Sequence, residues 1–228
     1  MGDTPAKAAT RAALPAASGE GQADIADIRA ILIIVGVPGS GKTTIATALA
    51  QRLGWPLEEG EELLPPPDIA KLHSAHPLDD RNRWSQLEKV AAWIDRCRQL
   101  GTGGVITCAA LKRSHRDFLT RGRPEARVVY LHGERTLVVS RLASRKEASS
   151  PLELLDRVFA ILEEPDPDEE TIRVDVSTPV EDIVAEILRK LAPQAPENPA
   201  VARDSTERPA KAWSSRSDRS RIQALRRY

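Results

Sequence analysis

The segment GVPGSGKTT, from Gly36 to Thr44, constrains the fold of this chain more than any other part of the sequence. It fits the pattern G-x-x-x-x-G-K-[ST], in which glycines let the backbone curl so that successive N–H groups point at phosphate oxygens. The β-branched run ILIIV precedes it, and an amphipathic stretch that ends before Gly54 follows it. A buried strand, a glycine-rich loop and a helix N-terminus in this order predict a phosphate-binding loop.

The residues of this loop predict a bound nucleotide. We expect Lys42 to reach the β- and γ-phosphates and the Thr43 hydroxyl to bind Mg²⁺. Nucleotide contacts are expected along the whole loop, which comprises Gly36, Val37, Pro38, Gly39, Ser40, Gly41, Lys42, Thr43 and Thr44. GTPases and motor ATPases share such a loop, but the later strand-like run VITC ends in Cys108 and not in Asp. A compact chain without that Asp favours a small-molecule kinase.

The middle of the chain alternates strand patterns with helix patterns. Strands are expected at 31–35, 105–108, 127–131 and 171–176, and helices at 43–53, 83–100, 114–121, 134–145, 152–162 and 179–191. Within 83–100, one face carries Leu87, Val90, Ala91, Ile94 and Cys97. Strands separated by helices predict an α/β fold, a three-layer sandwich around a parallel five-stranded sheet.

Composition limits the domain organisation and the partners. Residues 30–191 are enough for one well-buried domain, whereas 1–29 is an Ala-rich tail and 192–228 is Pro-rich and then basic, and both tails are expected to be disordered. The 33 basic and 33 acidic residues balance, so no nucleic-acid partner is expected. No apolar run is long enough to span a membrane, and no secretory signal is recognisable, so we expect a cytoplasmic protein. Two cysteines exclude a disulfide scaffold.

Six further segments, in the same order, resemble the gluconokinase family, whose P-loop kinase fold is similar to that of shikimate and adenylate kinases. They are LGWPLEEGEELLPPPDIAKL, HPLDDRNRWSQL, CAALKRSHRDFLTRG, VVYLHGERTLVVSRLASRK, LLDRVFAILEEPDPDE and VDVSTPVEDIVAEI. The resemblance spans about residues 33–188 and leaves out both tails. It implies an enzyme that phosphorylates D-gluconate at its terminal hydroxyl with ATP and Mg²⁺, giving 6-phosphogluconate. Homodimers are common in this family, so a homodimer is a possible assembly.

The resemblance also implies a set of site residues. Glu59 and Glu61 match two family aspartates, of which one would serve the Mg²⁺ shell and the other would orient or deprotonate the acceptor hydroxyl. With Lys42 they form the expected catalytic set. The lid arginines that grip the ATP phosphates correspond to Arg141 and Arg145. The substrate carboxylate would be held by Arg83, Lys112 and Arg116.

Several positions depart from the family pattern near the expected substrate site. Each Glu of the Glu59-Gly60-Glu61 turn is one methylene longer than the family Asp. Leu64 replaces His, Asp68 replaces Asn, Asn82 replaces Asp, Ser85-Gln86 replaces Pro-Trp, and Ala109 replaces Ser. These changes leave two alternatives open: a kinase of the same fold for another small hydroxylated acceptor, and a nucleotide-binding regulatory protein without catalysis.

Overall fold

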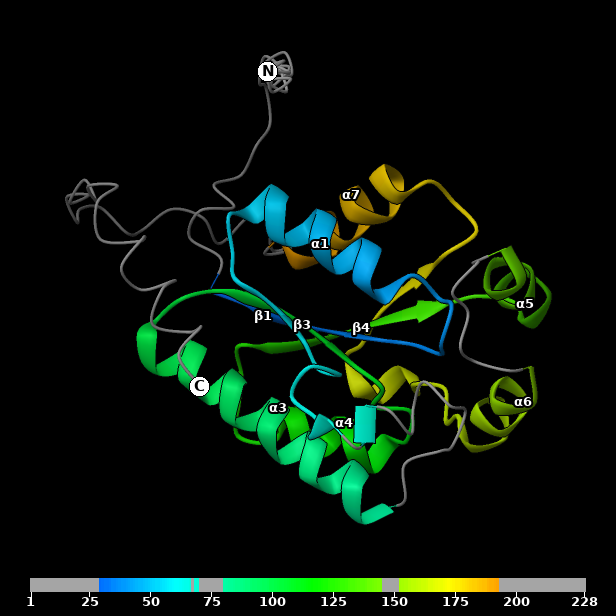
Figure 1. Ribbon diagram of the computed structural model, residues 1–228. Coiled ribbons are helices and arrows are strands. Elements are labelled where there is room, and N and C mark those ends of the chain that lie inside the picture. Colours follow the sequence, from blue (N-terminus) through cyan, green and yellow to red (C-terminus); the bar gives the residue numbers. More distant parts are fainter. Residues whose placement is uncertain (1–28, 67, 70–79, 145–151, 193–228) are drawn as a thin grey trace, which may run out of the picture.

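Five parallel strands form the single sheet of the computed structural model, which describes residues 29–66, 68–69, 80–144 and 152–192. The strands are β1 (Ile31–Val35), β2 (Leu57–Glu59), β3 (Gly104–Cys108), β4 (Ala126–His132) and β5 (Ile172–Asp175). Their order across the sheet is β2-β3-β1-β4-β5, and every neighbouring pair is parallel. The predicted α/β fold with a five-stranded parallel sheet is therefore confirmed (Figure 1).

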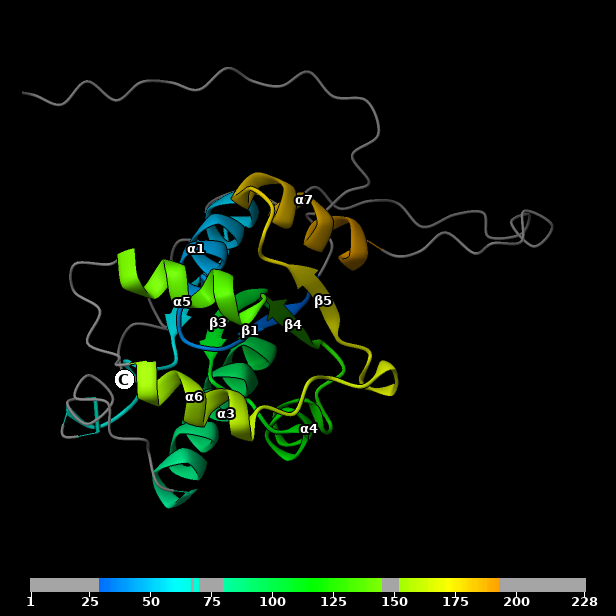
Figure 2. The same cartoon turned by 90° about the vertical axis from the view of Figure 1, so that its right-hand side faces the viewer.

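Helices cover both faces of this sheet. One face carries α1 (Lys42–Leu53) and α7 (Val180–Leu191), and the other carries α3 (Asp80–Leu100) and α4 (Arg113–Thr120). Helices α5 (Arg135–Ser144) and α6 (Leu152–Ile161) lie beyond the end of the sheet toward which the β4 arrow points (Figures 1 and 2). A short 3₁₀ helix, Pro167–Glu169, precedes β5. The three layers leave the carboxyl ends of the strands facing α5 and α6.

The apolar run of β1 explains why the two helical layers close on the sheet. Successive side chains of a strand point to opposite faces. Ile31, Ile33 and Val35 pack in the cluster under α3, whereas Leu32 and Ile34 pack in the cluster under α1 and α7. All five are buried because both faces are covered, as in other parallel sheets. The predicted apolar face of α3 is buried in the same way.

A third apolar cluster ties α5 and α6 to the loops at the carboxyl ends of the strands. It joins Val138 and Leu142 of α5, and Leu155 and Val158 of α6, to Val37 after β1 and Leu111 after β3. The two outer helices are therefore packed onto the phosphate-binding loop.

Strand β2 is the one element of the sheet that the sequence pattern did not locate. It has three residues, of which two are Glu58 and Glu59, and these do not read as a buried strand. It forms at the edge of the sheet, where it pairs only with β3 and its side chains are half-buried. The expectations for the tails concern residues 1–28 and 193–228, which lie outside the described residues.

Candidate active site

The phosphate-binding loop connects β1 to α1 and is ordered by its own backbone. The Ser40 N–H donates to the Val37 carbonyl at 3.1 Å, and Gly41, in the left-handed region with φ 93°, caps α1. Lys42 folds back over the loop, and its Nζ donates to the carbonyls of Gly36 and Val37 at 3.1 and 3.2 Å. The ammonium group thus lies over the mouth of the loop, where phosphates would bind.

Gly39 shows how closely the loop packs against α5. Its φ is 82°, and a Cβ at this position would come within 2.7 Å of Leu142 Cγ. Any other residue there would be strained by the positive φ and would press on the Leu142 and Val138 side chains of α5. The loop and α5 therefore act as one packed unit around the nucleotide position.

A cavity of about 230 Å³ lies between this loop, α5 and the segment that joins β5 to α7. From the loop and α1 it is lined by Gly39, Ser40, Gly41, Thr44 and Ile45, and from the other side by Arg141, Ser144, Val176, Thr178, Val180 and Ile183. Arg141 donates from Nη2 to the Val176 carbonyl at 2.6 Å and so joins α5 to the β5–α7 segment. Five of the residues expected to bind the nucleotide line this cavity. Arg145 lies outside the described residues.

The turn Glu59-Gly60-Glu61 follows β2 and is bound to the end of β3. The Thr107 hydroxyl donates to Glu59 Oε2 at 2.5 Å, and the Gly60 N–H donates to the Thr107 carbonyl at 3.1 Å. A Cβ on Gly60 would lie 2.2 Å from that carbonyl oxygen, so only glycine permits this approach. Glu59 is half-buried and Glu61 is exposed. The two carboxylates therefore have different surroundings.

The edge strand separates the glutamates of the acidic run. Neighbouring side chains alternate between faces, so Glu58 points to the face opposite that of Glu59. Burial, and then the charges of Glu62 and Glu59, raise the pKa of the Glu58 carboxyl above its ordinary value. Glu58 and Glu59 therefore lie on opposite faces of β2, and Glu59 is the last residue of the strand.

The register of the sheet brings Glu59 and the phosphate-binding loop to the same edge. Glu59 is level with Thr107, and Cys108 is level with Val35, the last residue before the loop. Two strand spacings of about 4.8 Å separate β2 from β1, which leaves roughly 10 Å for a phosphoryl group and an acceptor. The carboxylate and the loop therefore face one common space.

Arg83 reaches the same region from α3. Burial raises the pKa of the Cys108 thiol to about 11, while the positive charges of Arg83 and Lys42 act in the opposite direction. Both cations therefore lie near the carboxyl end of β3. The raised pKa leaves Cys108 a protonated, buried thiol, as expected of a core residue.

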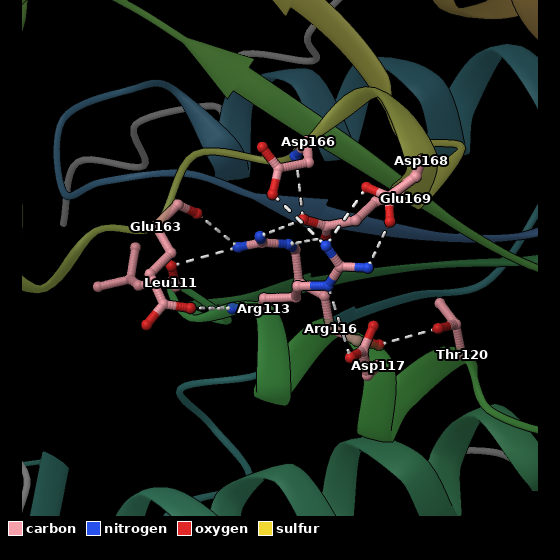
Figure 3. A network of polar contacts seen from close by, with 9 residues as sticks. All are labelled: Leu111, Arg113, Arg116, Asp117, Thr120, Glu163, Asp166, Asp168 and Glu169. Carbon is pink, nitrogen blue, oxygen red and sulfur yellow. Dashed lines mark hydrogen bonds and ion pairs between the residues drawn. The ribbon is translucent and has the colours of Figure 1, made fainter.

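Arg116 occupies a different environment from the one expected of a substrate ligand. It is 2% exposed, and its guanidinium donates to both oxygens of Glu169 at 2.6 and 2.8 Å and to the carbonyls of Leu111 and Glu163 (Figure 3). Through these contacts the guanidinium joins α4 to the acidic segment 163–169 before β5. This geometry assigns Arg116 a structural contact in place of the expected substrate contact. Lys112, the residue before α4, is half-buried.

Two departures from the family pattern contact each other. Asn82 Nδ2 donates to Asp68 Oδ1 at 3.0 Å. The family pattern has Asn at the position of Asp68 and Asp at the position of Asn82, so this chain exchanges the two side chains. The exchange keeps one amide and one carboxylate in contact.

The oxygen donors at this edge fit Mg²⁺ carried by a nucleotide. No group of three His, Cys, Asp or Glu side chains within the described residues is placed to hold a metal. Mg²⁺ bound with phosphates needs only one or two protein oxygens and keeps several waters. The Thr43 hydroxyl is exposed at the start of α1 and is the protein oxygen that fits this role.

Sequence reasoning missed two polar residues that shape the acidic turn. Thr107 was read only as part of a strand, and Gln86 only as a departure from Pro-Trp. Both are buried, and each is hydrogen-bonded to the turn. A lone polar residue inside an apolar strand, such as Thr107 in VITC, is the signal that could have pointed to the first. Nothing in the sequence pairs Gln86 with Gly60.

A phosphate-binding loop after the first strand of a parallel sheet, with a cavity beside it that an arginine helps to line, defines a P-loop kinase. A family model described as an AAA domain matches residues 31–165. The chain belongs to the gluconokinase family. It is 37% identical over 158 residues to the gluconokinase of Gluconobacter oxydans, a match that covers 69% of this chain and 89% of that protein. It is 35% identical to the thermoresistant gluconokinase of Escherichia coli, covering 70% and 94%.

Solved structures support the same assignment. A sugar kinase from Janibacter sp. is 35% identical with a TM-score of 0.67, and the match covers 71% of this chain and 94% of that one. A gluconokinase from Sinorhizobium meliloti is also 35% identical with a TM-score of 0.65, covering 72% and 93%. Within the described residues, no helix has the length and apolar character needed to cross a bilayer.

Proposed function

We propose that this protein transfers the γ-phosphoryl group of ATP to the terminal hydroxyl of D-gluconate, giving 6-phosphogluconate and ADP. The observation that carries the proposal is a complete phosphate-binding loop in a member of the gluconokinase family. The relatives named gluconokinases match over most of their own length, so the whole catalytic domain is represented. The compensated pair Asp68–Asn82 supports a maintained substrate site.

The reaction needs a proton acceptor and charge neutralisation. The gluconate oxygen forms a bond to the γ-phosphorus, the bond from that phosphorus to the bridging oxygen breaks, and ADP leaves with the electron pair. We assign Glu59 as the carboxylate that orients the hydroxyl and accepts its proton, because it lies at the strand end facing the loop. Lys42 and Arg141 would balance phosphate charge. Thr43 would hold Mg²⁺, which neutralises charge on the phosphate oxygens when bound.

The carboxylate of gluconate requires a cation on the acceptor side. We propose Arg83 and Lys112 for this contact, since Arg83 lies near the end of β3 and Lys112 follows that strand. Arg116 is left out because Glu169 already takes the Nε and Nη2 edge of its guanidinium, and the Leu111 and Glu163 carbonyls take Nη1. Arg145 is kept as a second phosphate-binding arginine on the basis of the family pattern alone.

The test is Mg²⁺-dependent ATP turnover, measured by coupled ADP release with and without D-gluconate. We expect turnover to depend on gluconate and to fall by about 10²–10³-fold in Lys42→Ala, the order of magnitude for loss of one preorganised charge contact. Arg52→Ala, which removes an exposed cation from the last turn of α1, is the control and should leave the rate unchanged. ATP binding without gluconate-dependent turnover would overturn the proposal, and a panel of other polyols would then identify the acceptor.

We further propose a cytoplasmic enzyme that acts on small molecules and forms a homodimer. Both cysteines are unpaired and buried, which fits a reducing compartment. Light scattering of the purified chain would determine the assembly, since a monomeric mass excludes the dimer.

A further inference from the structure

We propose that Thr107 and Gln86 are positioning residues that adapt this site to a glutamate at position 59. The inference rests on the proposed function, because it deepens the role of Glu59. Its evidence is a chain of buried hydrogen bonds that runs from β3 and α3 to the acidic turn and ends on the Glu59 carboxylate.

The Thr107 hydroxyl forms hydrogen bonds to the turn both as a donor and as an acceptor. It is 3% exposed, and its single proton goes to Glu59 Oε2 at 2.5 Å. Its oxygen accepts the Gly60 N–H at 3.2 Å. A hydroxyl has one donor and two acceptor positions, so these contacts fix its orientation. A charge-assisted bond of this length holds Oε2 at the end of β3.

Gln86 fixes the other side of Gly60. Its side chain is 2% exposed, and Nε2 donates to the Gly60 carbonyl at 2.7 Å. The peptide groups on both sides of Gly60 are therefore held, one from β3 and one from α3. A buried carbonyl left without this donor would be unsatisfied, which is unfavourable. The backbone after Glu59 is thus held in place by two separate elements.

The network leaves one carboxylate oxygen available. Glu59 Oε1 is buried and has no hydrogen-bond partner, whereas Oε2 is bound to Thr107. A buried acceptor without a donor is unfavourable unless a ligand supplies one. The hydroxyl of the acceptor substrate is a donor of the required kind. We therefore assign Oε1 as the oxygen that meets the acceptor hydroxyl, and Thr107 as the residue that aims it.

This arrangement connects two departures from the family pattern. Glu59 is one methylene longer than the family Asp, and Gln86 stands where the pattern has Trp. The hydrogen bond to Thr107 bends the longer Glu59 side chain toward β3. Gln86 holds the turn in the position that this hydrogen bond requires. Because a misplacement near 1 Å can cost about a hundredfold in rate, the two changes are matched.

The experiment compares Thr107→Val, Thr107→Ser and Gln86→Leu in the full chain. We expect Thr107→Val to lower kcat by about 10–100-fold with less than a threefold change in KM for ATP, because geometry is lost while the nucleotide site is intact. Thr107→Ser should keep most of the activity. Thr120→Val is the matched control, since that hydroxyl bonds only to the Arg116 carbonyl. Thermal unfolding of each variant confirms that it is folded.

A double-mutant cycle separates positioning from a general structural effect. In a Glu59→Gln background, Thr107→Val should lower kcat by less than twofold, because the group that Thr107 aims no longer accepts a proton. A full, additive loss in that background would overturn the proposal, and so would an unchanged kcat in Thr107→Val. If Thr107→Val does not fold, Thr107→Ala and Gln86→Leu carry the same cycle.

The proposed function and this inference can fail separately. If the wild-type chain shows no gluconate-dependent turnover, the proposed acceptor is wrong, and the cycle is measured on slow ATP hydrolysis by water. A loss of hydrolysis in Thr107→Val that disappears in the Glu59→Gln background supports the positioning role. Equal hydrolysis rates in wild type and Thr107→Val overturn it.

Discussion

At the scale of single residues, surroundings separate side chains that the sequence presents as equivalent. Glu59 and Glu61 both match family aspartates, yet Glu59 is half-buried and bonded to Thr107, whereas Glu61 is exposed. Arg83 and Arg116 were both expected to hold a carboxylate. Arg83 lies near the end of β3, whereas Arg116 is taken up by Glu169. Hydrogen-bond partners and burial therefore distinguish side chains of the same type that the sequence alone cannot separate.

The two glutamates should differ in their effect on catalysis. We expect Glu59→Gln to lower kcat by about a hundredfold or more, because general-base catalysis contributes about 10²–10⁴-fold. Glu61→Gln should lower it by less than tenfold, since an exposed carboxylate is screened by solvent. Steady-state kinetics with saturating ATP and gluconate measures both. A larger loss in Glu61→Gln would reverse the assignment.

At the scale of elements, side-chain pairs join segments that are distant in the sequence. Asp68 and Asn82 join the residues after the acidic turn to α3. Arg116 and Glu169 join α4 to the segment before β5 through an ion pair whose side chains are 3% and 4% exposed. Trp84 of α3 meets His115 and Phe118 of α4 edge-on. These pairs set the position of α3 and α4 beneath the site.

The exchanged pair predicts a reciprocal rescue. Asn82→Asp alone places two carboxylates in contact and should lower the stability by about 1–2 kcal/mol through the lost hydrogen bond. Adding Asp68→Asn restores one amide and one carboxylate, so the double variant should recover wild-type melting and kcat/KM for gluconate. Thermal unfolding and kinetics of the two single variants and the double variant give the answer. No recovery in the double variant would mean that the contact has no role.

The buried ion pair predicts a pH-dependent contribution to stability. The Arg116 guanidinium holds the pKa of the Glu169 carboxyl below its ordinary value. Its stabilisation is therefore complete above the unfolded-state pKa near 4.5 and is lost as the pH falls through the lowered folded-state pKa. At pH 7, Glu169→Gln should lose about 3–5 kcal/mol, which corresponds to a Tm lower by roughly 6–20 °C.

The difference in Tm between Glu169→Gln and wild type should shrink as the pH falls below about 4.5, because the carboxyl of the unfolded wild type takes up a proton there, and it should disappear once the folded-state carboxyl is protonated as well. The control is Asp168→Asn, which removes the exposed partner of Arg113 in the same segment. It should change Tm little at any pH, since exposed pairs contribute little. A difference for Glu169→Gln that stays constant from pH 3 to 7 would contradict the electrostatic origin.

At the scale of the whole molecule, the apolar core and the matches to the relatives each take up only part of the chain. All three apolar clusters are built by residues between Ala30 and Leu191. The relatives match over 89% and 94% of their own length while covering about 70% of this chain. The limits 30–191 for the catalytic domain stay a prediction, which truncation can test.

Truncation tests this domain assignment. Deleting residues 1–27 and 196–228 should leave Tm within about 2 °C and kcat within about twofold, because the three apolar clusters of the described residues keep all their side chains. A second truncation that also removes α7 should not fold, since it strips Ile183, Val184 and Ile187 from the core under α1. Circular dichroism and turnover distinguish the two truncated chains. A large loss of Tm in the first truncation would place part of the core in a tail.

The sequence by itself determined the phosphate-binding loop, the alternation of strands and helices and the family. These depend on local spacing and on apolar periodicity, which can be read without knowing what lies nearby in space. The edge strand β2, the exchange of Asp68 with Asn82, the commitment of Arg116 to Glu169 and the contacts of Glu59 with Thr107 were decided by the tertiary structure. Each depends on residues between 14 and 53 positions apart, brought together only when β3 and α3 pack beside the acidic turn and α4 meets the segment before β5.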